Sequence, residues 1–204
     1  MFENAKPRLE LIAPADLSDA QRAVYDAITG EPRASQGGTV PIADDSGRLV
    51  GSYAIMLLTP GIGAAMQQVG AEIRFCTALT DRERELAILT VAGELRCDFE
   101  RLAHQPAATE AGLTDTQVEE ALRGRVPGGL SAAEELVIKL AHIMTADRDL
   151  SDVDYEEAQA LGAERLAELT WLVGYYSALA LSLAVFRPTL PESFITAQGK
   201  EPTI

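Results

Sequence analysis

Apolar residues recur along most of the chain at the spacing of three and four residues that is typical of amphipathic helices. Met66, Val69, Ile73 and Cys76, for example, follow one another at intervals of three, four and three residues. Alternation of apolar and polar residues, which would indicate strands, extends over no more than four or five residues. The pattern predicts an all-α fold of about seven to nine helices, with Cys76 in the core.

Hydroxyl residues that are followed three positions later by Gln or Glu mark several helix starts. In such a capping box the hydroxyl accepts a hydrogen bond from the backbone of the first turn, and the Gln or Glu side chain accepts one from the capping residue. The pairs are Ser18 with Gln21, Thr80 with Glu83, Thr114 with Gln117, and Ser131 with Glu134. We also expect a helix over about 60–79, a bend near 96–98, and a last helix over about 163–187.

The length of 204 residues fits one domain with short tails. Residues 1–16 contain proline and show no periodicity, so we expect an extended N-terminal arm, and residues 191–204 are expected to form a loose tail. A single all-helical domain then covers residues 17–190. Within it, residues 31–52 form a polar loop of unusual length, which suggests that this loop covers a functional site.

Composition and charge exclude several classes of partner. Apolar residues make up 47% of the chain, and 17 basic against 31 acidic residues give a formal charge of −14. A nucleic acid or an anionic membrane surface would need a basic face, so neither is expected as a partner. Two cysteines indicate a reducing compartment, and the N-terminus lacks the pattern of a signal peptide, so we expect a cytoplasmic protein. The apolar run 169–186 is interpreted as a buried helix.

Three chemically reactive side chains lie close together in the sequence. If the segment after residue 96 is helical, Cys97, Glu100 and His104 share one face. The backbone N–H groups of a helix start would favour a thiolate at Cys97, and a carboxyl beside it would have a raised pKa suited to acid–base work. A solvated Glu–His pair and a core cysteine are the plainer interpretation. No metal site is expected, because a fourth ligand has no sequence signal, and no cofactor is expected.

These residues belong to a longer set of motifs that resembles the carboxymuconolactone decarboxylase-like superfamily, which also contains the alkylhydroperoxidase D type proteins. The resemblance covers about residues 45–190. Its motifs are Thr80-Asp81-Arg82-Glu83-Arg84-Glu85-Leu86-Ala87-Ile88-Leu89, Cys97-x-x-Glu100-x-x-x-His104 and Ala111-Gly112-Leu113-Thr114, with weaker similarity in 47–51, 56–60 and 168–186. It implies an all-helical fold, assembly of identical chains as trimers or hexamers, and sites near the contacts between subunits.

The peroxidase branch of this family uses a proton relay whose spacing is partly present here. In that branch a Glu stands twelve residues before the first Cys of a Cys-x-x-Cys pair, and a His stands four residues after the second. Glu85, Cys97 and His104 match these positions, whereas Glu100 replaces the second Cys. A dithiol peroxidase resolves the sulfenic acid on one Cys with a neighbouring thiol. Because Glu100 stands in place of that thiol, no local disulfide can form here.

We therefore expect a lyase or isomerase that performs acid–base chemistry on a small carboxylated or lactone-like substrate. Glu100 and His104 would exchange a proton with it, Glu85 would orient His104, and Cys97 would line the site. The first alternative is a hydroperoxide reductase with peroxiredoxin-type activity that uses Cys97 and an external resolving thiol. The second is a non-catalytic helical oligomer or binding module, in which Glu85, Glu100 and His104 face water or pair only within one helix.

Four further residues are candidates for binding the substrate. Arg82, like Arg74, could hold a substrate carboxylate through its planar guanidinium. Tyr53 follows the long polar loop, and Trp171 and Tyr175 lie on the last predicted helix, where their polar tips could meet a ligand. Surface ion pairs for the arginines, and packing in the core or between subunits for the aromatic residues, are the alternatives.

Overall fold

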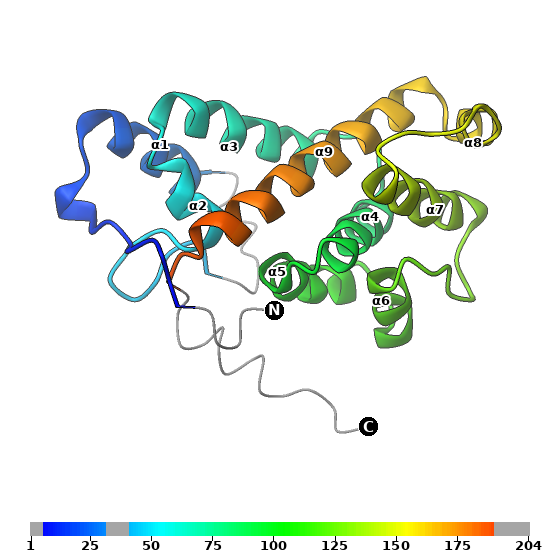
Figure 1. Ribbon diagram of the computed structural model, residues 1–204, viewed down its shortest axis with the longest axis horizontal. Coiled ribbons are helices and arrows are strands. Elements are labelled where there is room, and N and C mark those ends of the chain that lie inside the picture. Colours follow the sequence, from blue (N-terminus) through cyan, green and yellow to red (C-terminus); the bar gives the residue numbers. More distant parts are fainter. Residues whose placement is uncertain (1–5, 32–40, 190–204) are drawn as a thin grey trace. The chain divides into compact units, whose positions relative to one another are not determined.

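The computed structural model describes residues 6–31 and 41–189. In this part of the chain it contains nine α-helices, two short 3₁₀ helices and no strand, only the isolated bridges Leu9–Pro188 and Ala43–Leu49 (Figure 1). The predicted all-α fold is confirmed. The expected tail over 191–204, most of the long loop's first half and the first residues of the arm lie outside the described residues.

From α2 onward the helices follow one another with short connections. In chain order they are η1 (Pro14–Asp16), α1 (Asp19–Thr29), α2 (Gly51–Met56), α3 (Pro60–Phe75), α4 (Asp81–Glu94), α5 (Asp98–Glu110), α6 (Asp115–Leu122), α7 (Ala132–Ala146), α8 (Asp152–Ala158), η2 (Gln159–Leu161) and α9 (Ala163–Phe186). The helix expected over 60–79 ends at Phe75. Because Cys76 lies beyond this end, it leaves the apolar stripe and is exposed, so the prediction that Cys76 belongs to the core is wrong.

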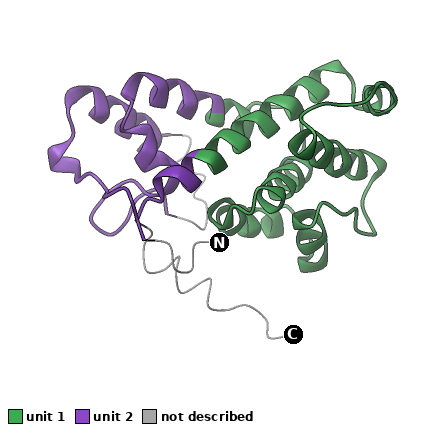
Figure 2. Cartoon of the chain, viewed as in Figure 1, with its two compact units in different colours: residues 1, 70–181 green, residues 2–69, 182–204 purple. Residues whose placement is uncertain are grey.

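The chain divides into two compact units, which Figure 2 shows in different colours. One comprises Gly70–Leu181, and the other comprises Phe2–Val69 with Ser182–Ile204. The division falls inside α3 and α9. The single domain over 17–190, with its long loop over a site, stays a prediction.

All four predicted capping boxes are present. At the start of α4, Thr80 accepts a hydrogen bond from the backbone N–H of Glu83, and the Glu83 carboxylate accepts one from the backbone N–H of Thr80 at 2.9 Å. The same reciprocal pair begins α1, α6 and α7. Substitution of such a cap by alanine typically costs about 1 kcal/mol, so these helix starts are encoded locally.

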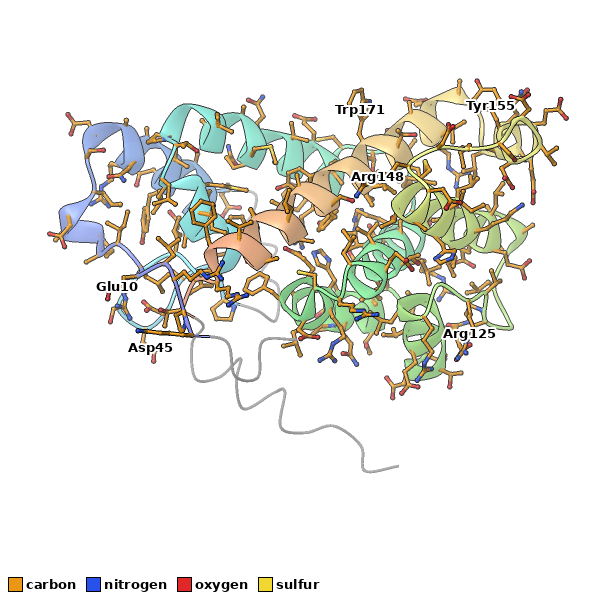
Figure 3. The ribbon with its side chains drawn as sticks, viewed as in Figure 1. Glu10, Asp45, Arg125, Arg148, Tyr155 and Trp171 are labelled. Atoms are coloured by element: carbon orange, nitrogen blue, oxygen red, sulfur yellow. The ribbon has the colours of Figure 1, made fainter. Side chains whose placement is uncertain are left out.

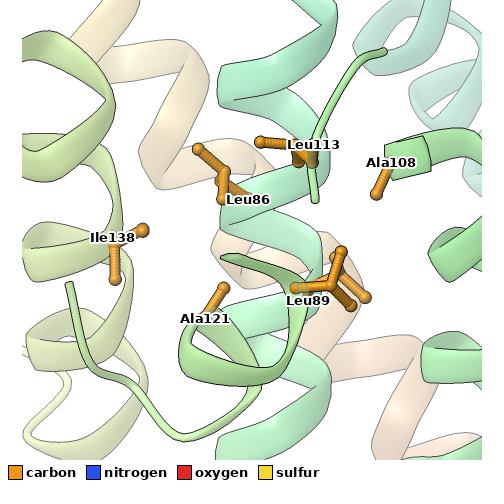
Figure 4. Packing of buried hydrophobic residues seen from close by; sticks show 7 residues of the cluster. Leu86, Leu89, Ala108, Leu113, Ala121 and Ile138 are labelled. Atoms are coloured by element: carbon orange, nitrogen blue, oxygen red, sulfur yellow. The ribbon is translucent and has the colours of Figure 1, made fainter. Parts of the chain in front are cut away.

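The Gly70–Leu181 unit is built around α4. Residues 85–92 of this helix are buried without interruption, and α5, α6 and α7 pack against it. The central cluster, seen in Figure 4, consists of Leu86, Leu89, Ala108, Leu113, Val118, Ala121 and Ile138. A Cβ atom on Gly93 would lie 1.9 Å from the carbonyl oxygen of Leu122, so the lack of a side chain here lets α4 and α6 approach closely.

The other unit is held by hydrogen bonds between side chains and backbone. Gln21 of α1 donates to the carbonyl of Leu57 at 3.0 Å, and the hydroxyl of Tyr25 donates to the carbonyl of Gly47 at 3.0 Å. The segment before α2 turns around Asp44, whose carboxylate accepts bonds from the backbone N–H groups of Ser46 and Arg48. These bonds fix the described half of the polar loop.

The last helix is long and apolar. Among the described residues α9 is the one helix that could cross a membrane by length and composition, with a mean hydropathy of 1.6 over its most apolar window. Leu169, Leu172 and Leu183 are buried within the structure, whereas Trp171, Leu181 and Val185 are exposed. The helix predicted to be buried is therefore buried on part of its surface, and no membrane span is evident.

Candidate active site

Two neighbouring helices bring two carboxyl groups and one imidazole together. Glu85 comes from the middle of α4, and Glu100 and His104 come from successive turns of α5. α5 starts after a sharp bend at Arg96, whose φ is +52°, and its inner face packs on α4. The three side chains are almost fully buried, with 2%, 4% and 3% of their surface exposed, so they interact with little screening by water.

The imidazole of His104 lies between the two carboxyl groups. Its Nδ1 is 2.7 Å from Oε2 of Glu85, a short hydrogen bond that joins the two helices. Its Nε2 is 3.6 Å from Oε2 of Glu100. Glu85 also faces the guanidinium of Arg84, with 3.5 Å between Oε1 and Nε. We assign the donated proton to Nδ1, because an ionised Glu85 can only accept.

The two carboxyl groups have pKa values shifted in opposite directions. Burial raises the pKa of Glu85, but the charge of His104 and its hydrogen bond, with Arg84 and Arg74 nearby, outweigh burial and hold that pKa below its ordinary value. For Glu100 burial dominates and raises the pKa, because its attraction to His104 and Arg74 compensates only in part. One carboxyl is therefore held as an anion while the other favours the neutral acid, the division of roles that acid–base sites require.

Cys97 lies at the start of α5 as its N-terminal capping residue, with an extended backbone (φ −94°, ψ 90°). Its thiol is buried, and burial together with the charge of Glu100 raises its pKa to about 12, despite hydrogen bonds from the backbone N–H groups of Glu100 and Phe99. The expectation that the helix start favours a thiolate is wrong, because the cost of burying the charge exceeds the gain from these backbone groups.

Tyr176 of α9 is the aromatic neighbour of the imidazole. The centroids of its ring and that of His104 are 5.2 Å apart, and the ring planes meet at 85°. The neighbouring Tyr175 packs on Tyr176 in the same perpendicular manner, at 5.3 Å and 87°. Tyr175, and not Tyr176, is the residue named from the sequence, because adjacent residues on an apolar helix carry no signal for which one faces a site.

The other predicted binding residues are Arg82, Trp171 and Tyr53. Arg82 donates to Glu134 at 2.5 Å and to the carbonyl of Gly112 at 2.6 Å, so its guanidinium is engaged between α4 and α7. Trp171 projects from α9 with 71% of its surface exposed (Figure 3). Tyr53 is half-buried in α2, within the other unit. Their roles in substrate binding stay predictions.

Arg74 is the cation whose charge acts on this site most widely. It lies in the last turn of α3, is half-buried, and belongs to the same unit as His104. Its positive charge lowers the pKa of Glu85, of Glu100 and of Tyr176, in each case against burial. Over the described ranges, no group of three or more His, Cys, Asp or Glu side chains is placed to hold a metal ion.

Comparison with known proteins places this site in a family. Residues 60–142 match the model of the Carboxymuconolactone decarboxylase family, and this segment contains all of α4 and α5 with Glu85, Cys97, Glu100 and His104. A search of curated proteins finds none that matches the chain. The match supports the resemblance found in the motifs: residues 60–142, which carry the site, are similar to the carboxymuconolactone decarboxylase family.

Proposed function

We propose that Glu85, His104 and Glu100 form a proton relay that performs general acid–base catalysis on a small carboxylated or lactone-like substrate. The observation that carries this proposal is the position of one buried imidazole between two carboxyl groups with opposite pKa shifts. Charge repulsion, burial and hydrogen bonding are tuned in this way where a side chain must give or take a proton near neutral pH.

Each residue has a distinct part in the proposed relay. In the neutral ring of His104 the anionic Glu85 accepts the Nδ1 proton and fixes the tautomer, so that Nε2 can take a proton from an acidic C–H of the substrate. The ring then carries the positive charge that Glu85 stabilises. Glu100, whose pKa is raised by burial, then delivers its proton to another carbon of the delocalised carbanion, and the Nε2 proton of His104 passes to the resulting Glu100 carboxylate, which restores both groups. In an isomerisation the two steps move a double bond; in a decarboxylation loss of carbon dioxide creates the carbanion, and Glu100 protonates it.

Two details of Glu100 favour a role toward a ligand. Its Oε1 atom is buried and has no hydrogen-bond partner among the described residues, and a buried polar atom of this kind needs a reason to persist. The separation of 3.6 Å between its Oε2 and His104 Nε2 is longer than a hydrogen bond. Catalytic hydrogen bonds often shorten only when the substrate is bound.

The charge of Arg74 supports a negatively charged substrate. The chain as a whole carries −14 and would repel an anion, so a carboxylate must be attracted by a local cation. Arg74 acts on both carboxyl groups of the relay. We propose that Arg74 supplies this attraction. We also propose that the protein acts in the cytoplasm as a homo-oligomer.

The test measures turnover of a panel of carboxylated lactones and β-keto acids. Release of carbon dioxide reports decarboxylation, and deuterium uptake from heavy water reports proton exchange at carbon. Glu100→Gln and His104→Ala should each lower turnover by about 10²-fold or more, the usual contribution of a general acid or base. Glu110→Gln and His142→Asn, which change half-exposed or exposed groups elsewhere, are matched controls. Full turnover in both relay variants would contradict the proposal.

The peroxidase alternative makes a different prediction for Cys97. A thiol with a pKa of about 12 is almost entirely protonated at neutral pH, and the thiolate is the species that attacks peroxide. We therefore expect Cys97→Ser to leave any consumption of hydroperoxide unchanged; a loss confined to this variant would favour the thiol mechanism. The non-catalytic alternative expected water-facing groups or pairs within one helix, whereas the Glu85–His104 bond is buried and joins α4 to α5.

A further inference from the structure

The ring of Tyr176 packs perpendicularly against the imidazole of His104. Only 3% of the Tyr176 surface is exposed, and the two rings lie 5.2 Å apart at 85°. Perpendicular aromatic pairs at this distance attract each other and resist rotation of either ring. Nδ1 of His104 is held by its hydrogen bond to Glu85, but Nε2 lies 3.6 Å from Glu100, beyond hydrogen-bond distance. A single hydrogen bond does not fix the plane of the ring.

Tyr176 is itself held in place by a second layer. Tyr175 packs on it at 5.3 Å and 87°, and Tyr175 is also buried. The hydroxyl of Tyr175 lies so close to α3 that a Cβ on Gly70 would be 2.2 Å from its oxygen. Gly70, Tyr175, Tyr176 and His104 thus form one continuous contact from α3 through α9 to α5, all within the Gly70–Leu181 unit.

We infer that Tyr176 is a positioning residue whose ring holds the imidazole of His104 in the plane that joins Glu85 to Glu100. This inference rests on the proposed function, since it assigns Tyr176 a part in the same relay. The ring, and not the hydroxyl, has this role. Burial raises the pKa of Tyr176 well above its ordinary value, so its hydroxyl keeps its proton and does not pass it along the relay.

The experiment distinguishes the role of the Tyr176 ring from the role of its hydroxyl. It measures the structure of the site and its activity by independent readouts. Proton and nitrogen NMR of the full chain, with His104 selectively labelled, reports the hydrogen-bonded Nδ1 proton without any substrate. Tyr176→Phe should keep this signal and full turnover. Tyr176→Leu should broaden or remove it and lower kcat by about tenfold with KM changed less than twofold, as expected for loss of one perpendicular ring pair.

Two further variants keep the test decisive. Tyr155→Leu makes the same change at an exposed tyrosine of α8 and should alter neither readout. If Tyr176→Leu folds poorly, Tyr176→Met replaces it in the experiment, because methionine fills most of the same volume without a planar ring. It should show the same loss of the Nδ1 signal and the same fall in kcat. An unchanged Nδ1 signal in Tyr176→Met would overturn the inference, as would an equal loss in Tyr176→Phe. Failure of the relay itself would show separately, as full turnover in His104→Ala with the NMR results intact.

Discussion

Replacement of Glu85 by glutamine tests whether the site depends on a buried charge. The amide has the size of the carboxyl group, so packing around α4 is kept. Its oxygen can still accept the Nδ1 proton of His104, but its NH₂ group must then face Arg84, which is 3.5 Å from the second carboxylate oxygen. The variant therefore exchanges a charge-assisted bond for a neutral one and loses the ion pair with Arg84.

The expected loss follows from the two contacts. A hydrogen bond to a charged group contributes about 1.5–3 kcal/mol to stability, against about 0.5–1.5 kcal/mol for a neutral one. The difference predicts that Glu85→Gln lowers the free energy of unfolding by about 1–2 kcal/mol at neutral pH. Burial of the carboxylate reduces its benefit, but the lowered pKa of Glu85 shows that the folded state still stabilises the anion.

The same reasoning fixes the dependence on pH. A carboxyl whose pKa is lower in the folded state contributes stability that is present above its ordinary pKa, about 4.3, and is lost as the pH falls through the folded value. The difference in the free energy of unfolding between Glu85→Gln and the parent chain should therefore disappear at the acid end of the range.

Urea unfolding followed by far-ultraviolet circular dichroism, from about pH 7 to about pH 3, measures this gap across the ordinary carboxyl pKa range. Glu110→Gln, which changes an exposed carboxylate near the end of the same α5 helix, is the matched control and should stay within about 0.5 kcal/mol of the parent. Equal stability of Glu85→Gln and the parent at neutral pH would refute the reasoning. So would a gap that is largest at the acid end.

Three further changes test the charges and packing of the same unit. Because the pKa of Glu100 is raised by burial, its contribution is present below its ordinary pKa and lost as the pH rises through the folded value. The free energy of unfolding of Glu100→Gln should therefore rise relative to the parent as the pH increases above the ordinary carboxyl pKa, and a difference that stays the same or falls with pH would contradict the raised pKa. Leu89→Ala should cost about 2–5 kcal/mol in urea unfolding, because this side chain is fully buried in the central cluster; a cost below about 1 kcal/mol would show that the site collapses freely. Gly93→Ala should lower the melting temperature, since its Cβ would meet the carbonyl of Leu122 at 1.9 Å, whereas helix propensity alone predicts a gain of about 1 kcal/mol.

Much of the fold was predictable because its signals are local. Each capping box places a hydroxyl and a Gln or Glu within one turn, and no distant contact is needed to read it. The end of α3 was not predictable in this way. The apolar spacing continues through Cys76, but the chain leaves the helix at Phe75, and the next helix start, the capping box at Thr80, lies five residues further on.

The site shows the same division between local and distant information. The spacing of Glu100 and His104 follows from one helix, and their shared burial on α5 agrees with it. The pKa of Cys97 was predicted in the wrong direction, because the number of side chains that cover a thiol is a property of the whole unit. Tyr176 reaches His104 from α9, more than seventy residues away in sequence, and no local pattern distinguishes it from Tyr175.

The reciprocal caps also bear on how quickly the chain acquires its structure. Helix α4 receives its start from Thr80 and Glu83, and the helices packed on it follow it directly in the sequence. Few long segments must therefore be ordered before the central contacts of this unit form. Contacts between near neighbours in sequence form faster than contacts between distant segments, because less loop-closure entropy is lost, so loss of the Thr80 hydroxyl should slow refolding as well as weaken α4.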